Sequence, residues 1–255
     1  MVSGLDQLRH DLGAAMSGAD SALAAADQLC HACVEFLGVD GASVSLVHAG
    51  SSQGTFGSSG ELSRRLDALQ FTFGEGPCLD SVRDGTPVLV ADLADPTEQR
   101  WPAFRGAVLE SGVNAVFALP VAIATLPIGA LDLFCNRSGA LTAQSMSGGL
   151  LAAELAALPL LDLMAADVAW DSAGQSDVGW QQLASLERVE VYQATGMIMA
   201  ALDISPTDAL VRLRAHAFAY GMTASEAAWA VVERRLSLDS DDWRSEPGQP
   251  SAGSR

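Results

Sequence analysis

The spacing of apolar residues divides most of the chain into helical and extended stretches. From Leu5 to Leu37, apolar positions recur every three or four residues, which predicts helix with weak points at Gly13 and Gly18. Alternating apolar runs, typical of strands, and short amphipathic segments follow. The predicted strands are Ala42–Val47, Pro87–Val90, Ala115–Ile123 and Ile128–Phe134, with a short one at Thr55-Phe56 in a glycine-rich loop. The predicted helices are Leu62–Leu69, Pro77–Arg83, Trp101–Ser111 and a long one from Leu141 to about Val168.

The C-terminal part has the pattern of three helices joined by two tight turns. Its first helix carries an apolar face of Val191, Ala194, Ile198 and Ala201. Ser205-Pro206 begins the second helix, and Thr223 with Glu226 forms a capping box for the third. Polar, small-residue-rich sequence lies on both sides of this group. The predicted boundaries are a first domain at 1–170, a linker at 171–179, the three-helix domain at 180–236 and a disordered tail at 237–255.

Composition constrains the partners of both domains. The 255 residues suit two small domains, and the formal net charge of −17 opposes binding to nucleic acid, which requires local positive potential. The range from Trp180 to Leu236, however, contains five arginines and six acidic residues, so its net charge is close to zero and does not oppose a binding face there. Every basic side chain is arginine, because the chain contains no lysine.

The cysteines and histidines predict neither an enzyme site nor a metal site. Without a signal peptide or a membrane span, the four cysteines are interpreted as reduced thiols of a cytoplasmic protein. Cys30 and Cys33 share a helix face, but no second pair completes a zinc site, so we expect two buried thiols. Cys78 is expected near a helix N-terminus, which lowers a thiol pKa and suits a redox or ligand-contact thiol; the interpretation we favour is nevertheless simple packing. The four histidines are scattered, and no nucleophile–base pair or phosphate-binding glycine loop is present, so we expect no catalysis and no cofactor.

The first domain resembles a GAF domain, a sensory fold, over about Leu23–Ala166. The residues that carry the likeness are Leu37–Ala42, Gly74-Glu-Gly-Pro-Cys78, Val113–Pro120 and Gly129–Leu133. This resemblance implies an α+β fold with a central antiparallel sheet flanked by helices. It also implies an unknown small-molecule or redox signal, with Cys78 beside the ligand pocket. With the later Arg100-Trp101-Pro102, the Gly74–Cys78 segment looks most like GAF domains that are fused to ANTAR domains.

The C-terminal domain resembles an ANTAR domain, an RNA-binding module of bacterial antitermination regulators. The likeness rests on R-x-x-x-x-Q-A-x-G from Arg188 to Gly196 and A-x-x-x-L-R-x-x-A from Ala209 to Ala217. It implies a dimer that holds RNA stem-loops and so prevents them from refolding into a transcription terminator. The RNA contacts it implies are Arg188, Arg212 and Arg214, with a close-approach patch of Gln193, Ala194, Thr195 and Gly196. Thr195 stands where the family usually has lysine, at a position expected to be exposed on its helix.

Alternative interpretations remain open. Arg212 is also placed to pair with Asp208 one turn away on a solvated face, and the small-residue patch is also suited to helix–helix packing. One rival function is a helix-turn-helix that binds DNA, built from Thr207–Tyr220 and Ala224–Leu236, with Arg234 and Arg235 on its last helix. Another is a protein-interaction module that has lost nucleic-acid binding.

A homodimer is also predicted from the first domain. The apolar faces of Gly4–Leu37 and Leu141–Val168 are wide enough to be expected to pair between protomers.

Overall fold

The computed structural model describes residues 4–48, 51–173 and 188–238, and the chain divides into two compact units, Met1–Arg188 and Val189–Arg255. The long helix α6 (Ala143–Ala173) ends later than predicted, so residues 171–173 of the predicted linker are helical. The remainder of that linker, and the predicted tail from 239, lie outside the described residues. No helix in the described part of the chain is long and apolar enough to cross a membrane.

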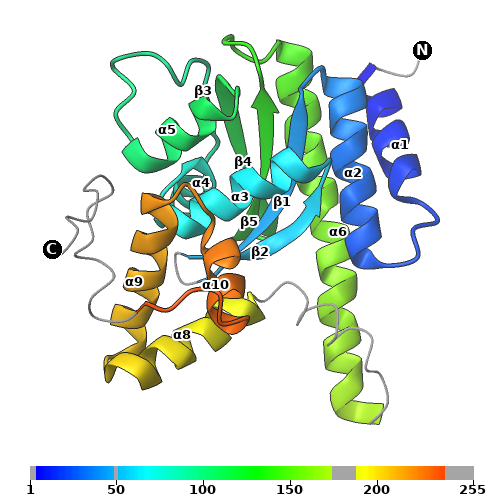
Figure 1. Ribbon diagram of the computed structural model, residues 1–255. Helices are drawn as coiled ribbons and strands as arrows, with labels where there is room; N and C mark the ends of the chain where they lie inside the picture. Colours follow the sequence, from blue (N-terminus) through cyan, green and yellow to red (C-terminus); the bar gives the residue numbers. More distant parts are fainter. Residues whose placement is uncertain (1–3, 49–50, 174–187, 239–255) are drawn as a thin grey trace, which may run out of the picture. The chain divides into compact units, whose positions relative to one another are not determined.

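The first unit is built on a five-stranded sheet with the order β2-β1-β5-β4-β3 (Figure 1). Every neighbouring pair of strands is antiparallel, which confirms the predicted α+β fold class. The strands are β1 (Gly41–His48), β2 (Ser51–Ser58), β3 (Val88–Val90), β4 (Ala115–Ile123) and β5 (Leu126–Cys135).

Strand β2 is longer than the two residues predicted from the sequence. It is an edge strand of serine, threonine and glycine, so it lacks the apolar alternation by which strands are detected. Close packing explains the glycine at position 57 of this strand. A Cβ there would lie 2.6 Å from the backbone carbonyl carbon of Ala26 on α2 (Ala22–Leu37). The glycine therefore permits α2 to lie directly against the edge of the sheet.

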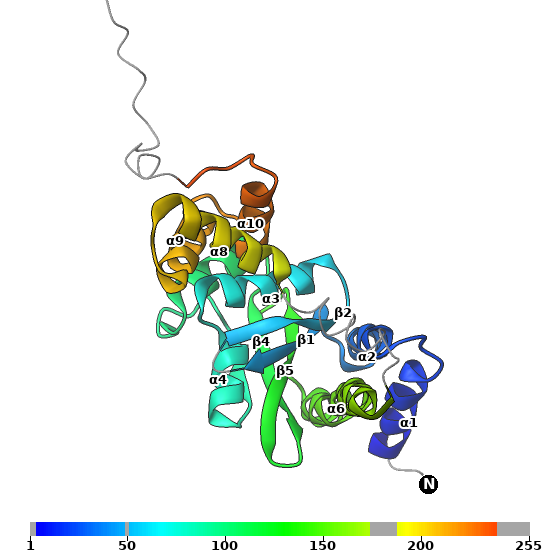
Figure 2. The same ribbon diagram turned by 90° about the horizontal axis from the view of Figure 1, so that it is seen from below.

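Helices cover both faces of the sheet. Helices α2 and α6 pack on one face, and α1 (Gly4–Met16) packs against these two helices, as Figure 2 shows from below. Helices α3 (Glu61–Phe73), α4 (Pro77–Asp84) and α5 (Pro102–Glu110) pack on the other. Alternation along β4 divides the two cores, because Phe117 and Leu119 face the first helix layer while Val116 and Ala118 face the second.

The apolar faces expected to pair between protomers are largely buried within one chain. Leu12 of α1, Leu29 and Cys33 of α2 and Ala152 and Ala156 of α6 are all fully buried in one core cluster. Burial of the stripes therefore does not require a second copy. Among the α6 side chains that the structure describes, the large apolar ones that remain exposed are Leu150, Leu158 and Leu161.

Helix α3 continues one turn beyond the predicted end at Leu69. It stops at Gly74, which has φ 66° and donates its N–H to the carbonyl of Gln70 (2.9 Å). The extra turn includes Gln70, three residues after Asp67, so both side chains project from the same side of the helix toward the sheet.

The second unit consists of α8 (Val189–Leu202), α9 (Pro206–Ala219) and α10 (Ala224–Val232). Ser205 caps α9 by accepting the N–H of Asp208 (3.1 Å), and Thr223 and Glu226 form the predicted capping box of α10. The core contains few large side chains. Its buried members are mainly alanines, with Val191, Ile198, Leu213 and Val231.

We expect residues 180–238 to fold in isolation, because the caps and the core of the three helices lie within them. Leu213→Ala removes the fully buried leucine of this small core and should lower the free energy of unfolding by about 2–5 kcal/mol. Val211→Ala, two residues away but exposed, should change it by less than about 0.5 kcal/mol. Urea unfolding followed by circular dichroism measures both. Equal effects of the two substitutions would contradict this assignment of the core.

Candidate functional site

A cluster of polar side chains is buried between the sheet and helices α3 and α4. Its centre consists of two carboxyl groups, Asp67 of α3 and Asp132 of β5, both inaccessible to solvent. The strands contribute short polar side chains around them: Ser43 and Ser45 from β1, Ser52 and Thr55 from β2. Sequence periodicity does not indicate such a cluster, because these residues lie on four different elements.

Asp67 is held by hydroxyl groups from the two strands at the sheet edge. Ser45 donates a short hydrogen bond to Oδ1, and Thr55 Oγ1 donates to Oδ2 at 2.5 Å. Ser52 Oγ is more distant, at 3.5 Å from Oδ1. Since these donors compensate the buried carboxylate, its position is fixed.

Asp132 belongs to a second chain of hydrogen bonds that leads to Cys78. The backbone N–H of Cys78 donates to Gln70 Oε1 (2.8 Å), and Gln70 Nε2 donates to Asp132 Oδ2 (2.6 Å). The other oxygen, Oδ1, has no hydrogen-bond partner among the described residues, nor has the buried hydroxyl of Ser43 on the neighbouring strand. The cluster thus contains two buried polar atoms available to a further donor or acceptor.

Burial determines the electrostatics of this cluster. It raises the pKa of Asp132 to about 8, with a further contribution from nearby Asp67 and an opposing one from the Gln70 hydrogen bond. Burial likewise raises the pKa of the Cys78 thiol, and Asp132 and Asp67 act in the same direction. The pKa lowering expected for Cys78 at a helix N-terminus is therefore wrong, because desolvation and two carboxyl groups outweigh it. Cys78 lies at the cluster as a neutral, fully buried thiol.

The Gly74–Cys78 segment fixes this arrangement through two local contacts. A Cβ at Gly76 would lie 2.4 Å from Gln70 Oε1, so only glycine leaves room for the Gln70 side chain. Glu75 Oε1 accepts the N–H groups of Ala103 and Phe104 at the start of α5 (2.7 and 3.0 Å).

Trp101 forms a second connection between the neighbourhoods of the Gly74–Cys78 and Arg100–Pro102 segments. Its Nε1–H donates to Asp80 Oδ2 of α4 (2.9 Å). The Gly74–Cys78 segment and the Arg100–Pro102 segment are therefore connected through the helices that each of them precedes.

Arg188, one of the predicted RNA contacts, reaches the same cluster. Its guanidinium forms an ion pair with Asp67 (Nη2 to Oδ2, 3.4 Å) and lies 4.4 Å from the ring centroid of Phe71 on α3. Only 11% of the Arg188 side chain is exposed. In this conformation the guanidinium is enclosed by residues of the first unit.

The other two predicted arginines lie on α9 and project from different sides of it. Arg212 is exposed and Arg214 is partly buried. Arg212, His216 and Tyr220 follow one another at intervals of four residues, so they share one side of the helix, and the rings of His216 and Tyr220 lie 4.4 Å apart.

The predicted small-residue patch on α8 is only partly accessible. Gln193 and Gly196 are exposed, and a Cβ at Gly196 would meet no atom within 4 Å. Ala194 is fully buried in the core, in agreement with the packing interpretation. Thr195 is 9% exposed and donates its hydroxyl to the carbonyl of Val191 (2.7 Å), so its expected exposure is wrong. The reason is that it borders the buried Val191–Ala194–Ile198 face.

Sequence analysis did not identify the aromatic surface of the second unit. All four aromatic residues between 189 and 238 are 51–64% exposed: Tyr192, Phe218, Tyr220 and Trp229. They come from all three helices. One feature of the sequence did indicate this exposure. Alanines occupy the periodic core positions of the three helices, so the aromatic rings are left outside the core.

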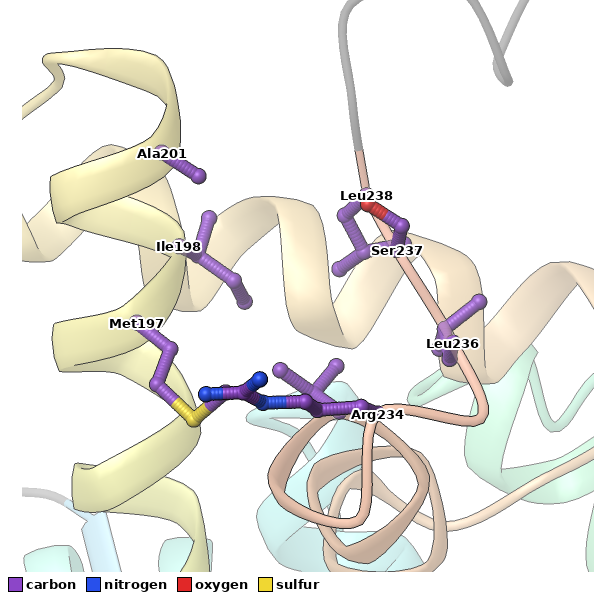
Figure 3. A pocket seen from close by; sticks show the side chains of 8 residues that line it. Met197, Ile198, Ala201, Arg234, Leu236, Ser237 and Leu238 are labelled. Carbon is purple, nitrogen blue, oxygen red and sulfur yellow. The ribbon is translucent and has the colours of Figure 1, made fainter.

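A small apolar groove of about 260 Å³ also lies in this unit, between α8 and the segment that follows α10. Figure 3 shows Met197, Ile198 and Ala201 on one side, and the side chain of Arg234 extending toward Met197. Its lining is mostly apolar, and Arg234 contributes its charged group.

Comparison with known proteins identifies the first unit. The family model of the GAF domain matches residues 20–158. The GAF domain of a phosphoenolpyruvate-protein phosphotransferase from Coxiella burnetii superposes with a TM-score of 0.52 at 15% identity, covering 66% of this chain and 98% of that one. The GAF domain of the Acinetobacter phosphotransferase gives 0.51 at 12% identity, covering 66% and 99%. At these identities the likeness establishes the fold. No curated protein matches the sequence.

The raised pKa of Asp132 predicts a specific pH dependence of stability. Because the folded-state value of about 8 exceeds the ordinary 3.8, the folded protein retains a proton that the unfolded chain has lost. The contribution of Asp132 to the stability of the folded protein is complete below about pH 4 and is lost as the pH rises to about 8. An asparagine side chain does not titrate. The stability of the Asp132→Asn variant should therefore decrease less than that of the wild type between about pH 5 and 8.

Urea unfolding of the full chain at the two pH values measures this difference. Asp162→Asn, at an exposed position of α6, is the matched control and should retain the wild-type pH dependence. Identical pH dependence in wild type and Asp132→Asn would refute the assignment.

Proposed function

The chain belongs to the GAF domain family, and from this membership we propose that it is a signal-responsive regulator with an RNA-binding output. In this proposal the first unit senses a small-molecule or redox signal, and the three-helix unit is an ANTAR-type domain that binds RNA stem-loops. The resemblance of Arg188–Ala217 to ANTAR sequences and the accessible chemistry of the second unit support it.

The observation that carries the RNA proposal is the exposure of every described aromatic residue in the second unit. Aromatic side chains contribute most to a core when they are buried, yet this unit builds its core from alanine. Exposed rings stack on unpaired bases in the loops of RNA hairpins. Arg212 lies in the same row as His216 and Tyr220 and would contact the phosphates beside such bases.

The geometry of α10 disfavours the helix-turn-helix alternative. The helix ends at Val232, before the predicted Leu236, and Arg234 follows with a left-handed φ of 59°. Arg235 forms an ion pair with Glu233 (2.5 Å). The two arginines that would read DNA bases are therefore not on the helix that would enter the groove.

The proposed action requires no catalysis. A protein that holds an RNA segment in one hairpin prevents it from joining a terminator, and one protein is used per RNA site. The sensor would act through its buried polar cluster, where Asp132 Oδ1, Ser43 and the Cys78 thiol offer groups to a small ligand, a proton or an oxidant. Since a ligand can shift an equilibrium only by differential affinity, it must bind the RNA-competent state more tightly.

RNA binding should depend on the exposed rings. Trp229→Ala and Tyr220→Ala should each weaken binding of a hairpin RNA with an unpaired loop by about 1–3 kcal/mol, the usual contribution of a stacked base. Arg212→Ala should weaken it and reduce the salt slope by about one. Leu126→Ala, which truncates an equally exposed apolar side chain in the first unit, is the control.

Fluorescence anisotropy at several salt concentrations, with duplex DNA as competitor, measures these effects. Equal displacement by duplex DNA would favour the DNA-binding alternative. The absence of salt-dependent RNA binding would favour the protein-interaction module.

We also propose a homodimer formed through the exposed row of Leu150, Leu158 and Leu161 on α6. The spacing places the three leucines on one side of the helix, at 42–51% exposure. Sedimentation at micromolar concentration should give a dimer for the wild type and a monomer for Leu158→Glu, whereas Leu126→Glu should remain dimeric. A monomeric wild type would rule this interface out.

A further inference from the structure

Arg188 cannot contact RNA in the conformation that the structure describes. Its side chain is 11% exposed, and its guanidinium is enclosed between a carboxylate and an aromatic ring. A phosphate contact requires an accessible guanidinium, since the fork of N–H donors must reach the phosphate oxygens. The same side chain therefore has two competing anionic partners, one within the protein and one on the RNA.

The internal partner is a complete guanidinium site on α3. Asp67 and Phe71 are one helical turn apart, so the carboxylate and the ring project from the same side of the helix. The carboxylate pairs with Arg188 at 3.4 Å, and the ring centroid lies 4.4 Å from the guanidinium carbon. Hydroxyl groups also bind the carboxylate: Ser45 donates to Oδ1, and Thr55 donates to Oδ2, the oxygen that Arg188 contacts. The site is therefore formed by the sensor itself, and Arg188 occupies it.

We propose that the Asp67–Phe71 site is an autoinhibitory guanidinium site, which withholds Arg188 from RNA. This inference rests on the proposed RNA-binding function and adds its regulation. Arg188 is the last residue of the first unit and is followed in sequence by the first residue of α8. Release of Arg188 adds one cation to the RNA-binding surface. A signal that loosens the Asp67 site thus increases RNA affinity.

The ligand chemistry follows from the occupant. A small molecule that bears a planar guanidinium, and that enters between Asp67 and Phe71, would displace Arg188 and activate RNA binding. Competition between the two requires no change in the fold of the sheet, because Ser45 and Thr55 hold the carboxylate in either state.

The decisive comparison is RNA affinity of the full chain with and without the internal site. Asp67→Asn keeps one oxygen that can accept from Ser45, and its amide N–H can donate to the Thr55 hydroxyl, but it removes the charge that holds Arg188. Phe71→Leu keeps an apolar side chain but removes the aromatic ring. Each should tighten binding of a hairpin RNA at least about threefold, because a larger fraction of the protein is competent to bind. Asp67→Asn should also steepen the salt slope by about one.

Two controls separate this effect from a general change in charge or stability. Asp162→Asn removes the same charge from an exposed position and should leave RNA affinity within the error of the measurement. In an Arg188→Ala background, Asp67→Asn and Phe71→Leu should have no effect on RNA affinity. Methylguanidine as a probe should tighten RNA binding of the wild type and not of Asp67→Asn.

A second readout does not involve RNA. Phenylglyoxal modifies accessible guanidinium groups, and mass spectrometry locates the modified residue. Arg188 should react slowly in the wild type and several-fold faster in Asp67→Asn and Phe71→Leu, while exposed Arg212 reacts equally in all three.

The outcomes distinguish the two proposals. If Arg188→Ala weakens RNA binding while Asp67→Asn and Phe71→Leu bind as the wild type does, the autoinhibitory site is refuted and the RNA-binding function stands. If no variant binds RNA, both are refuted. If Asp67→Asn does not fold, Phe71→Leu decides by the same criteria.

Discussion

The carboxylate of Asp67 is the constraint around which the first unit is arranged. A buried negative charge is costly unless donors surround it, and here they come from β1, β2 and Arg188. The edge strand β2 contributes Thr55 and Ser52, so a strand that is poor in apolar residues, and that pairs with β1 through two register shifts, still supplies donors to this carboxylate. In the proposed regulation, exchange of Arg188 for another cation at this carboxylate controls RNA binding.

Asp132 adds a second carboxyl group to the same interior, and the two differ in how they are compensated. Asp67 has hydroxyl donors and a guanidinium, whereas Asp132 has one amide donor and an oxygen without a described partner. Burial raises the pKa of Asp132, and the single hydrogen bond from Gln70 offsets this only in part. A GAF fold with such an interior is suited to report on a proton or a small polar ligand, since either changes the hydrogen bonding of α3.

Local sequence signals predicted most of the helices, because caps and apolar spacing act over a few residues. The capping box at Thr223 and the stop at Gly38 are examples that the structure confirms. The polar cluster was not predictable in this way, since Gln70 and Asp132 are far apart in sequence, and Arg188 and Asp67 farther still. Cys78 was placed correctly at a helix start, but its burial, which determines the thiol chemistry, depends on strands elsewhere.

The second unit shows the same limit in another form. Periodicity identified its alanine core, but the exposure of Tyr192, Phe218, Tyr220 and Trp229 follows from how closely three alanine-faced helices approach one another. Four exposed rings on so small a unit are available to a partner, and we propose that this partner is RNA.

The most direct test is ultraviolet crosslinking of the full chain to hairpin RNA, followed by mass spectrometry of the crosslinked peptides. The account predicts salt-sensitive crosslinks at the exposed aromatic residues of 189–238. Crosslinks confined to residues 1–173, or none above those of an unrelated acidic protein, would contradict it.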